Sequence, residues 1–158
     1  MGPLDAFVAR ADGALVVVTA ASPDGLFGCL VGFHTQVSIE PLRYAVCLSH
    51  RNATFAAAST ADALGVHLLG ADQIELASLF GEWSADDGVA KFDRCTWRRV
   101  GDGPPVVEPA LAWFVGGILE AVPMGDHTAF VLDPLRHGGS GDGEPLRYAA
   151  AAAFEAGH

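Results

Sequence analysis

The stretch RYAVCLSHRNATFAAA, residues 43–58, joins an apolar run to an alanine-rich run through a group of polar side chains. Residues 43–48 are typical of a buried strand, and residues 54–59 predict a short helix capped near Asn52 or Ala53. One capping side chain is enough to begin a helix. The junction instead carries five polar residues, which are Ser49, His50, Arg51, Asn52 and Thr54.

These polar residues are suited to bind a phosphate group. The start of a helix offers unpaired N–H groups and the positive end of the helix dipole, so anions bind there. Ser49, Asn52 and Thr54 would add neutral hydrogen-bonding groups. Arg51 would add a positive charge and can bind a phosphate through two parallel hydrogen bonds. The alternative is an ordinary capped helix with solvated polar neighbours, and the residues alone leave both interpretations open.

The rest of the chain predicts a mainly β fold. Closely spaced strand patterns with few helices favour a barrel over a doubly wound sheet. Residues 71–80 form an amphipathic helix pattern, residues 81–105 a polar Gly/Pro-rich excursion, and residues 149–153 a terminal helix. No linker divides the 158 residues, so one domain is expected over 1–158. The predicted strands are 14–20, 27–39, 42–48, 63–69, 110–122, 127–132 and 145–148.

The composition excludes several classes of function. The net charge of −10 argues against a nucleic-acid partner and against an anionic membrane surface. No apolar tract reaches the ~20 residues of a membrane span, and no targeting signal is seen, so a cytoplasmic protein is expected. Three cysteines without close pairs indicate a reduced protein with no disulfide framework and no metal site. Cys47, inside an apolar run, is expected in the core.

The segment GCLVGF, residues 28–33, interrupts a strand pattern with two glycines. A glycine in a strand marks a bulge or a close approach of another group to the backbone. A planar aromatic ligand could therefore lie against this backbone edge. A bent barrel strand without a ligand explains the same pattern, and the segment alone does not decide between them.

The segment MGDHT, residues 124–128, places His127 after a Gly-Asp turn and at the start of a predicted strand. Such a histidine can donate a hydrogen bond to a ligand or titrate near neutrality. The structural alternative is a histidine that only completes the turn.

A local basic cluster contains Lys91, Arg94, Arg98 and Arg99, which are four of the nine cationic residues. They are either a solvated strand face or a site for the phosphates of a second nucleotide. Signatures of serine hydrolases, zinc proteases, phosphate-binding loops and Rossmann dinucleotide sites are absent from the sequence. Hydrolysis and a classical nucleotide fold are therefore not predicted.

Taken in order, these segments resemble the flavin reductase-like family, which has an FMN-binding split barrel. Each motif is short, and their joint order over about residues 14–148 carries the resemblance. The matching pieces are Val18-Thr19, Gly28–Phe33, Ser38-Ile39-Glu40-Pro41, Asn52-Ala53-Thr54, the helix motif at residues 72–80, and Gly125-Asp126-His127.

The resemblance implies a homodimeric split β-barrel with two or three short helices. It further implies that NADH or NADPH reduces FMN, with FAD as the alternative flavin, and that reduced flavin passes to a separate monooxygenase. A rival interpretation is a flavin-binding protein that stores or senses the cofactor without turnover. His127 would lie near the nicotinamide as the catalytic candidate, and His67 stands where the family commonly has Asn. The implied flavin contacts are Cys29, Leu30, Val31, Gly32 and Phe33 at the ring, and Ser49, His50, Arg51, Asn52 and Thr54 at the phosphate.

Overall fold

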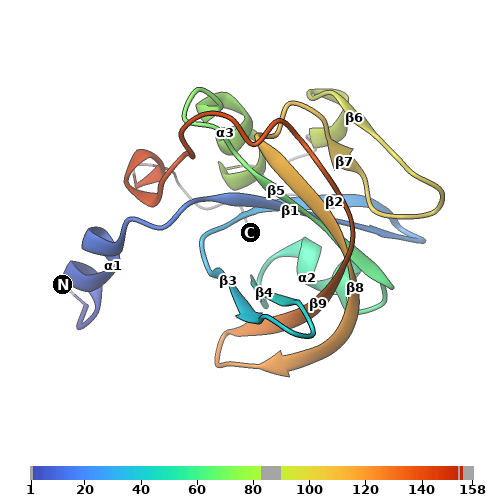
Figure 1. The fold of residues 1–158 in the computed structure, drawn as a ribbon, viewed down its shortest axis with the longest axis horizontal. Coiled ribbons are helices and arrows are strands. Elements are labelled where there is room, and N and C mark those ends of the chain that lie inside the picture. Colours follow the sequence, from blue (N-terminus) through green and yellow to red (C-terminus); the bar gives the residue numbers. More distant parts are fainter. Residues whose placement is uncertain (1, 83–89, 153, 155–158) are drawn as a thin grey trace.

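In this computed structural model the chain is described at residues 2–82, 90–152 and 154, and most of that part is β-structure. Its larger sheet has seven antiparallel strands in the order β2-β1-β5-β8-β9-β4-β3 (Figure 1). A mainly β fold is therefore confirmed. The strands are β1 (Val16–Ser22), β2 (Gly25–Val31), β3 (His34–Ser38), β4 (Arg43–Ser49), β5 (Ala63–Leu68), β8 (Ala112–Pro123) and β9 (His127–Gly138), and a second small sheet pairs β6 (Trp97–Arg98) with β7 (Val106–Val107).

The sheet curls so that its two halves share one core. Buried side chains from both halves pack together with the helix α2 (Ala53–Ala58), which a flat sheet could not achieve. The long strands β8 and β9 permit the bend, because their pairing shifts register between Val115 and Gly116 and again between Ile118 and Glu120 (Figure 1). Representative members of this core are Val18, Val46, Ala57, Val66 and Phe130.

A second apolar cluster lies beneath α3 (Ile74–Glu82) and the two ends of the chain. Phe80 of α3 packs there with Leu15 and Leu146, and Val107 joins from β7. Two short 3-10 helices, η2 (Lys91–Asp93) and η3 (Tyr148–Ala151), border this cluster. No helix in the described ranges is long and apolar enough to cross a membrane.

The predicted strand 27–39 is wrong as one element, because it is two strands at opposite ends of the sheet. β2 pairs with β1 at one edge, and β3 pairs with β4 at the other. The chain crosses between the edges at Gly32 and Phe33, and the Phe33 carbonyl accepts a hydrogen bond from Cys47 N at 2.9 Å. Residue alternation continues through this crossing, so the pattern alone suggested a single strand.

The two helices predicted at 54–59 and 71–80 are confirmed with small shifts. Asn52 caps α2 by accepting a hydrogen bond from Thr54 N at 2.9 Å. α3 begins three residues later than predicted because Gln73 closes a turn, accepting a hydrogen bond from Gly70 N through its side chain. The sequence did not predict α1 (Asp5–Ala11), which has no buried residue.

The C-terminal predictions need correction. The predicted strand 145–148 is two isolated bridges, Gly70 with Pro145 and Ala14 with Arg147. The predicted helix 149–153 is the shorter η3, with position 153 outside the described residues. Of the excursion predicted at 81–105, residues 83–89 are likewise outside the described part.

Candidate functional site

A cavity of about 320 Å³ lies where β2 ends and where β4 passes into α2. Its walls come from the crossing after β2, the ends of β4 and β9, the helix α3 and the C-terminal segment. The lining residues are Leu15, Cys29, Leu30, Val31, Gly32, Phe33, Cys47, Ser49, Asn52, Phe80, Gly81, His127, Tyr148, Ala151 and Phe154. Most of this surface is apolar, with polar side chains at the β4 and β9 ends.

The cavity brings together eight of the twelve residues predicted for the site, although they come from three separate parts of the sequence. These eight are Cys29, Leu30, Val31, Gly32, Phe33, Ser49, Asn52 and His127. The other four, which are His50, Arg51, Thr54 and His67, are not among the lining residues.

Strand register explains why Ser49 and His127 face the same space. They are direct partners in the antiparallel pair β4–β9, so their side chains emerge on one face of the sheet. Cys47, two residues before Ser49, lies on that face as well and lines the cavity. Cys47 is half-buried, so its predicted place in the core is wrong. The Phe33 ring lies 5.0 Å from the His127 ring, between centroids, and closes this side.

A neighbouring carboxylate fixes the orientation of His127. Nδ1 of His127 lies 2.7 Å from Oδ1 of Asp126. The hydrogen bond from His127, and then its positive charge when protonated, hold the pKa of Asp126 below its usual value. Because Nδ1 is occupied by Asp126, Nε2 is the ring nitrogen that remains for a ligand.

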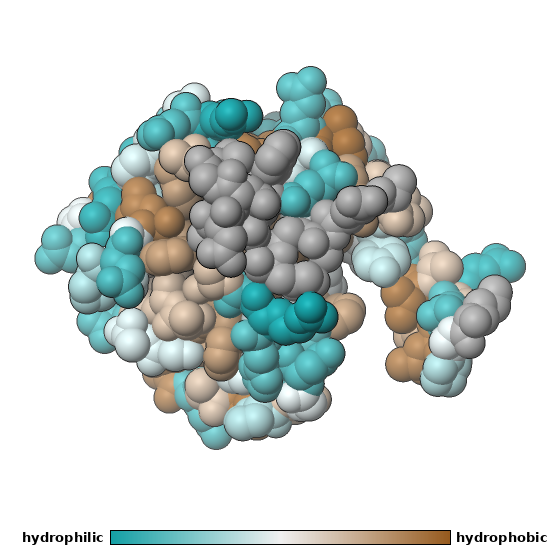
Figure 2. Space-filling model, turned by 180° about the vertical axis from the view of Figure 1, so that it is seen from behind, coloured by the Kyte–Doolittle hydropathy of each residue, from teal (hydrophilic) through white to brown (hydrophobic). Residues whose placement is uncertain are grey.

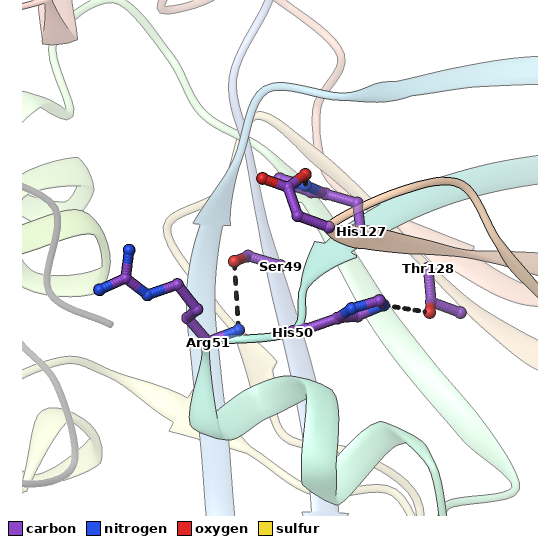
Figure 3. A network of polar contacts seen from close by, with 6 residues as sticks. Ser49, His50, Arg51, His127 and Thr128 are labelled. Carbon is purple, nitrogen blue, oxygen red and sulfur yellow. Dashed lines mark hydrogen bonds and ion pairs between the residues drawn. The ribbon is translucent and has the colours of Figure 1, made fainter.

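His50 and Arg51 point in opposite directions from the junction (Figure 3). His50 follows Ser49 and turns to the other face, where Nε2 lies 2.8 Å from the Thr128 hydroxyl. Its ring also packs on Phe55, with centroids 4.8 Å apart. His50 therefore belongs to the support of α2, contrary to its prediction as a phosphate contact.

Thr54 is also misplaced by the sequence prediction. It is 1% exposed and lies in the first turn of α2, where its hydroxyl hydrogen-bonds with the Cys29 thiol. Burial raises the pKa of Cys29 to about 11, against opposing effects from Thr54 and Lys91. The Cys29 side chain is thus a neutral thiol at neutral pH, and Thr54 holds it rather than a phosphate.

Most of the backbone N–H groups at the junction are already bonded inside the protein. The N–H of His50 donates to Asp126 O, that of Arg51 to the Ser49 hydroxyl, and that of Asn52 to Ser49 O. The side-chain donors that remain for an anion are the Arg51 guanidinium, the Ser49 hydroxyl and the Asn52 amide. Arg51 is exposed and stands in the sequence between Ser49 and Asn52, which line the cavity, and within the described residues it forms no ion pair.

His67 is a structural residue, which corrects its prediction as a flavin contact. It is fully buried away from the cavity, with Nδ1 2.9 Å from Val17 O and Nε2 accepting from Val107 N at 3.0 Å. Because a carbonyl only accepts, Nδ1 carries the proton and the ring is neutral. Burial lowers the pKa of His67 to about 4. His67 belongs to β5, and its imidazole thus hydrogen-bonds to both β1 and β7.

The basic cluster is largely used within the fold. Lys91 donates to the carbonyls of Gly28 and Phe80, which joins η2 to β2 and α3. Arg98 pairs with Glu108 at 3.0 Å, and Arg99 donates to loop carbonyls. These contacts favour the structural interpretation of the cluster over a site for a second nucleotide.

Sequence reasoning missed the contribution of α3 and of the C-terminal segment to the cavity. Phe80 and Gly81 come from α3, while Tyr148, Ala151 and Phe154 follow the last bridges of the chain. The helix motif at 72–80 located Phe80 in the sequence without indicating the direction of its ring. No local pattern around Tyr148 indicates a ligand.

Similarity to known proteins agrees with this arrangement. The family model described as "Flavin reductase like domain" matches residues 8–156. The FMN reductase (NADH) SmoA of Agrobacterium fabrum is 33% identical over 138 residues, which cover 87% of this chain and 76% of that protein. The chain spans between 66% and 76% of the length of the first curated relatives that it matches.

Solved structures share the fold. The NADH:FAD oxidoreductase SgcE6 of Streptomyces globisporus has a TM-score of 0.83 at 22% identity, covering 98% of this chain and 94% of that one. The styrene monooxygenase flavin reductase SMOB of Pseudomonas putida has a TM-score of 0.74 at 24% identity, covering 92% and 93%. With the family model matching nearly the whole sequence, the chain belongs to the flavin reductase like domain family.

Proposed function

We propose that this protein is a flavin reductase that transfers hydride from NADH or NADPH to FMN, with FAD as the alternative flavin. The observation that carries the proposal is the cavity, where eight predicted residues from separate segments meet. Family membership supports it, as do relatives named for NADH-dependent reduction of FMN.

The cavity fits a flavin in size and in polarity. A volume of about 320 Å³ lies within the ~300–1,000 Å³ range of small-molecule sites. The apolar wall from Cys29 to Phe33 suits a flat ring. The polar end at Ser49 and Asn52 suits the ribityl phosphate.

Arg51 is proposed as the main phosphate ligand. It is exposed, stands in the sequence between Ser49 and Asn52, and is free of ion pairs among the described residues. In a molecule with a net charge of −10, an exposed guanidinium provides the local attraction that a phosphate requires. Ser49 and Asn52 would add neutral donors, in place of the backbone groups that the fold has already used.

His127 is proposed to orient the nicotinamide. When bound together, flavin and NAD(P)H supply the hydride transfer themselves. The protein must hold the two rings in contact, and such orientation can lower a barrier by roughly 7–11 kcal/mol. Asp126 fixes the His127 ring, and Phe33 packs against it, so Nε2 has a defined direction toward a ligand amide.

A homodimeric split barrel is proposed on the basis of the exposed apolar surface. β3 is at the edge of the sheet, and Ile39 beside it is 85% exposed. The helix α1 stands off the body as a separate lobe that presents Leu4 and Phe7 (Figure 2). Burying these residues against a second copy would cover both features. Light scattering with multi-angle detection tests this, and a monomeric mass would contradict it.

A flavin-dependent monooxygenase is proposed as the consumer of the reduced flavin. A solved relative of the same fold is named as the flavin reductase of a styrene monooxygenase. The three cysteines are free, which supports the expected cytoplasmic location. An assay that separates this protein from a monooxygenase by a dialysis membrane would distinguish the two routes of transfer. Activity across the membrane would indicate that reduced flavin diffuses, and loss of activity would indicate transfer in a complex.

One assay tests the proposed function. Purified protein is mixed with NADH or NADPH, and absorbance at 340 nm is followed with and without added FMN or FAD. Oxidation that depends on added flavin is expected. A protein that binds FMN but oxidises neither nicotinamide would support the rival storage or sensing role. A protein that neither binds flavin nor oxidises nicotinamide would contradict both.

A further inference from the structure

The C-terminal segment forms one wall of the cavity. Tyr148, Ala151 and Phe154 line it, although none was predicted for the site. Tyr148 lies over Gly32, since a Cβ built at Gly32 would be 3.7 Å from Tyr148 Cδ2. Phe154 lies near Gly81 of α3 in the same way, at 3.5 Å. Two aromatic rings therefore face the wall formed by residues 29–33.

Tyr148 and Phe154 form what is called here the aromatic wall, and both line the cavity. Tyr148 is 42% exposed and lines the cavity of about 320 Å³, so its ring borders open space. A planar ligand against residues 29–33 would occupy that space. Aromatic rings bind planar π-systems well in offset or edge-to-face arrangements.

Asp12 holds this wall in place from the other end of the chain. Its carboxylate accepts a hydrogen bond from Ala149 N at 2.8 Å, and its carbonyl accepts from the Arg147 guanidinium at 3.3 Å. The neighbouring Gly13 carbonyl accepts from Tyr148 N at 2.8 Å. Figure 1 shows the result, with the red C-terminal helix beside the blue segment that joins α1 to β1.

The backbone at Asp12 is unusual in a way that serves this contact. Asp12 has φ of 44° and ψ of 57°, the left-handed conformation that ends α1. Asp and Asn are the non-glycine residues that tolerate this conformation best. The position therefore requires both a turn-compatible backbone and a side-chain oxygen that reaches Ala149.

We propose that Tyr148 and Phe154 are ring-contacting residues of the flavin site and that Asp12 is their positioning residue. The inference rests on the proposed flavin-binding function. In this proposal the aromatic wall sets the rate at which the flavin dissociates. That rate decides whether the flavin behaves as a retained cofactor or as an exchanging substrate.

Four variants test the proposal in flavin dissociation measured by stopped-flow fluorescence. Tyr148→Ala is expected to raise the dissociation rate of FMN about tenfold, as loss of an aromatic contact predicts. Tyr148→Phe keeps the ring and should remain within about twofold of wild type. Lumiflavin, which has the ring without the phosphate, should show the same ratio between variants as FMN.

The Asp12 pair separates positioning from general stability. Asp12→Gly keeps the left-handed backbone at little cost and removes the acceptor, so FMN should dissociate several-fold faster. Asp12→Asn keeps both the backbone preference and an acceptor oxygen, so it should restore the wild-type rate. Thermal unfolding of all four variants shows whether each is folded, which is expected because neither Asp12 nor Tyr148 belongs to an apolar core.

The outcomes distinguish this inference from the proposed function. If wild type binds FMN while Tyr148→Ala releases it at the wild-type rate, the aromatic wall is not a flavin contact and the inference fails alone. If FMN dissociates from Asp12→Asn as fast as from Asp12→Gly, the positioning role of Asp12 fails. If wild type does not bind FMN at all, the proposed function fails and this inference with it.

Discussion

Ser49 of β4 and His127 of β9 are direct partners in the antiparallel ladder, so both side chains enter one cavity from neighbouring strand ends. In the proposed site, Ser49 and Asn52 lie on the phosphate side, and His127 and Phe33 lie on the nicotinamide side. A single register thus sets the distance between the two halves of the proposed reaction. A shift of one of these strands by one residue would turn its side chain to the other face and separate the pair.

Removal of the Arg51 guanidinium should weaken phosphate recognition selectively. In Arg51→Ala the dissociation constant of FMN is expected to rise about tenfold or more, since a charge-assisted hydrogen bond contributes ~1.5–3 kcal/mol. Riboflavin, which has no phosphate, should bind as it does to wild type. Isothermal titration with both ligands measures the difference. Arg10→Ala, an exposed arginine on α1, is the matched control, and equal losses for FMN and riboflavin would refute the assignment.

His127→Ala should impair the nicotinamide step while leaving flavin binding intact. We expect kcat/KM for NADH to fall about tenfold, the effect of one lost hydrogen bond. The FMN titration curve should not move. His137→Ala changes an exposed histidine farther along β9 and serves as the control. A shift in FMN affinity for His127→Ala would place this histidine at the flavin instead.

Stability should fall in mild acid because of His67. Its pKa is about 4 in the folded protein, below the usual 6.5, so the unfolded chain takes up a proton that the folded chain does not. The contribution is complete above pH ~6.5 and is lost as the pH falls toward 4, by about 3 kcal/mol in total. Urea unfolding of wild type and His67→Gln at several pH values measures this, and equal pH slopes would contradict it.

Cysteine labelling should report on occupancy of the cavity. Cys47 is half-buried and lines it, whereas Cys95 is half-buried beside α3, outside it. Burial raises the pKa of both thiols, so labelling by iodoacetamide should be slow at neutral pH. FMN is expected to protect Cys47 and to leave Cys95 unchanged, as measured by peptide mass spectrometry. Equal protection of the two residues would indicate a general tightening of the fold.

The sequence predicted the parts of the site that depend on local chemistry. Asn52 was recognisable as a cap because caps need a short polar acceptor, and the β4 and β9 strands were recognisable by their apolar pattern. Alternation along β4 also holds in the structure, but it separates His50 from Ser49. The junction therefore contains two groups of polar residues, one facing the cavity and one supporting α2.

The features that the sequence did not predict depend on contacts between distant segments. His67 looks like a polar strand residue, and only the return of Val107 explains its burial. The crossing at Gly32 keeps the period of two although the chain changes edges of the sheet. Tyr148 reaches the cavity because Asp12, 136 positions earlier in the sequence, accepts hydrogen bonds from the residues on either side of it, Arg147 and Ala149. No window of neighbouring residues contains such information.

A crystal structure of the protein grown with FMN would show where the flavin binds. We expect the flavin ring to lie against residues 29–33 and its phosphate to lie within hydrogen-bonding distance of the Arg51 side chain. Density for FMN at another place, or a cavity that contains only solvent at saturating FMN, would contradict this placement.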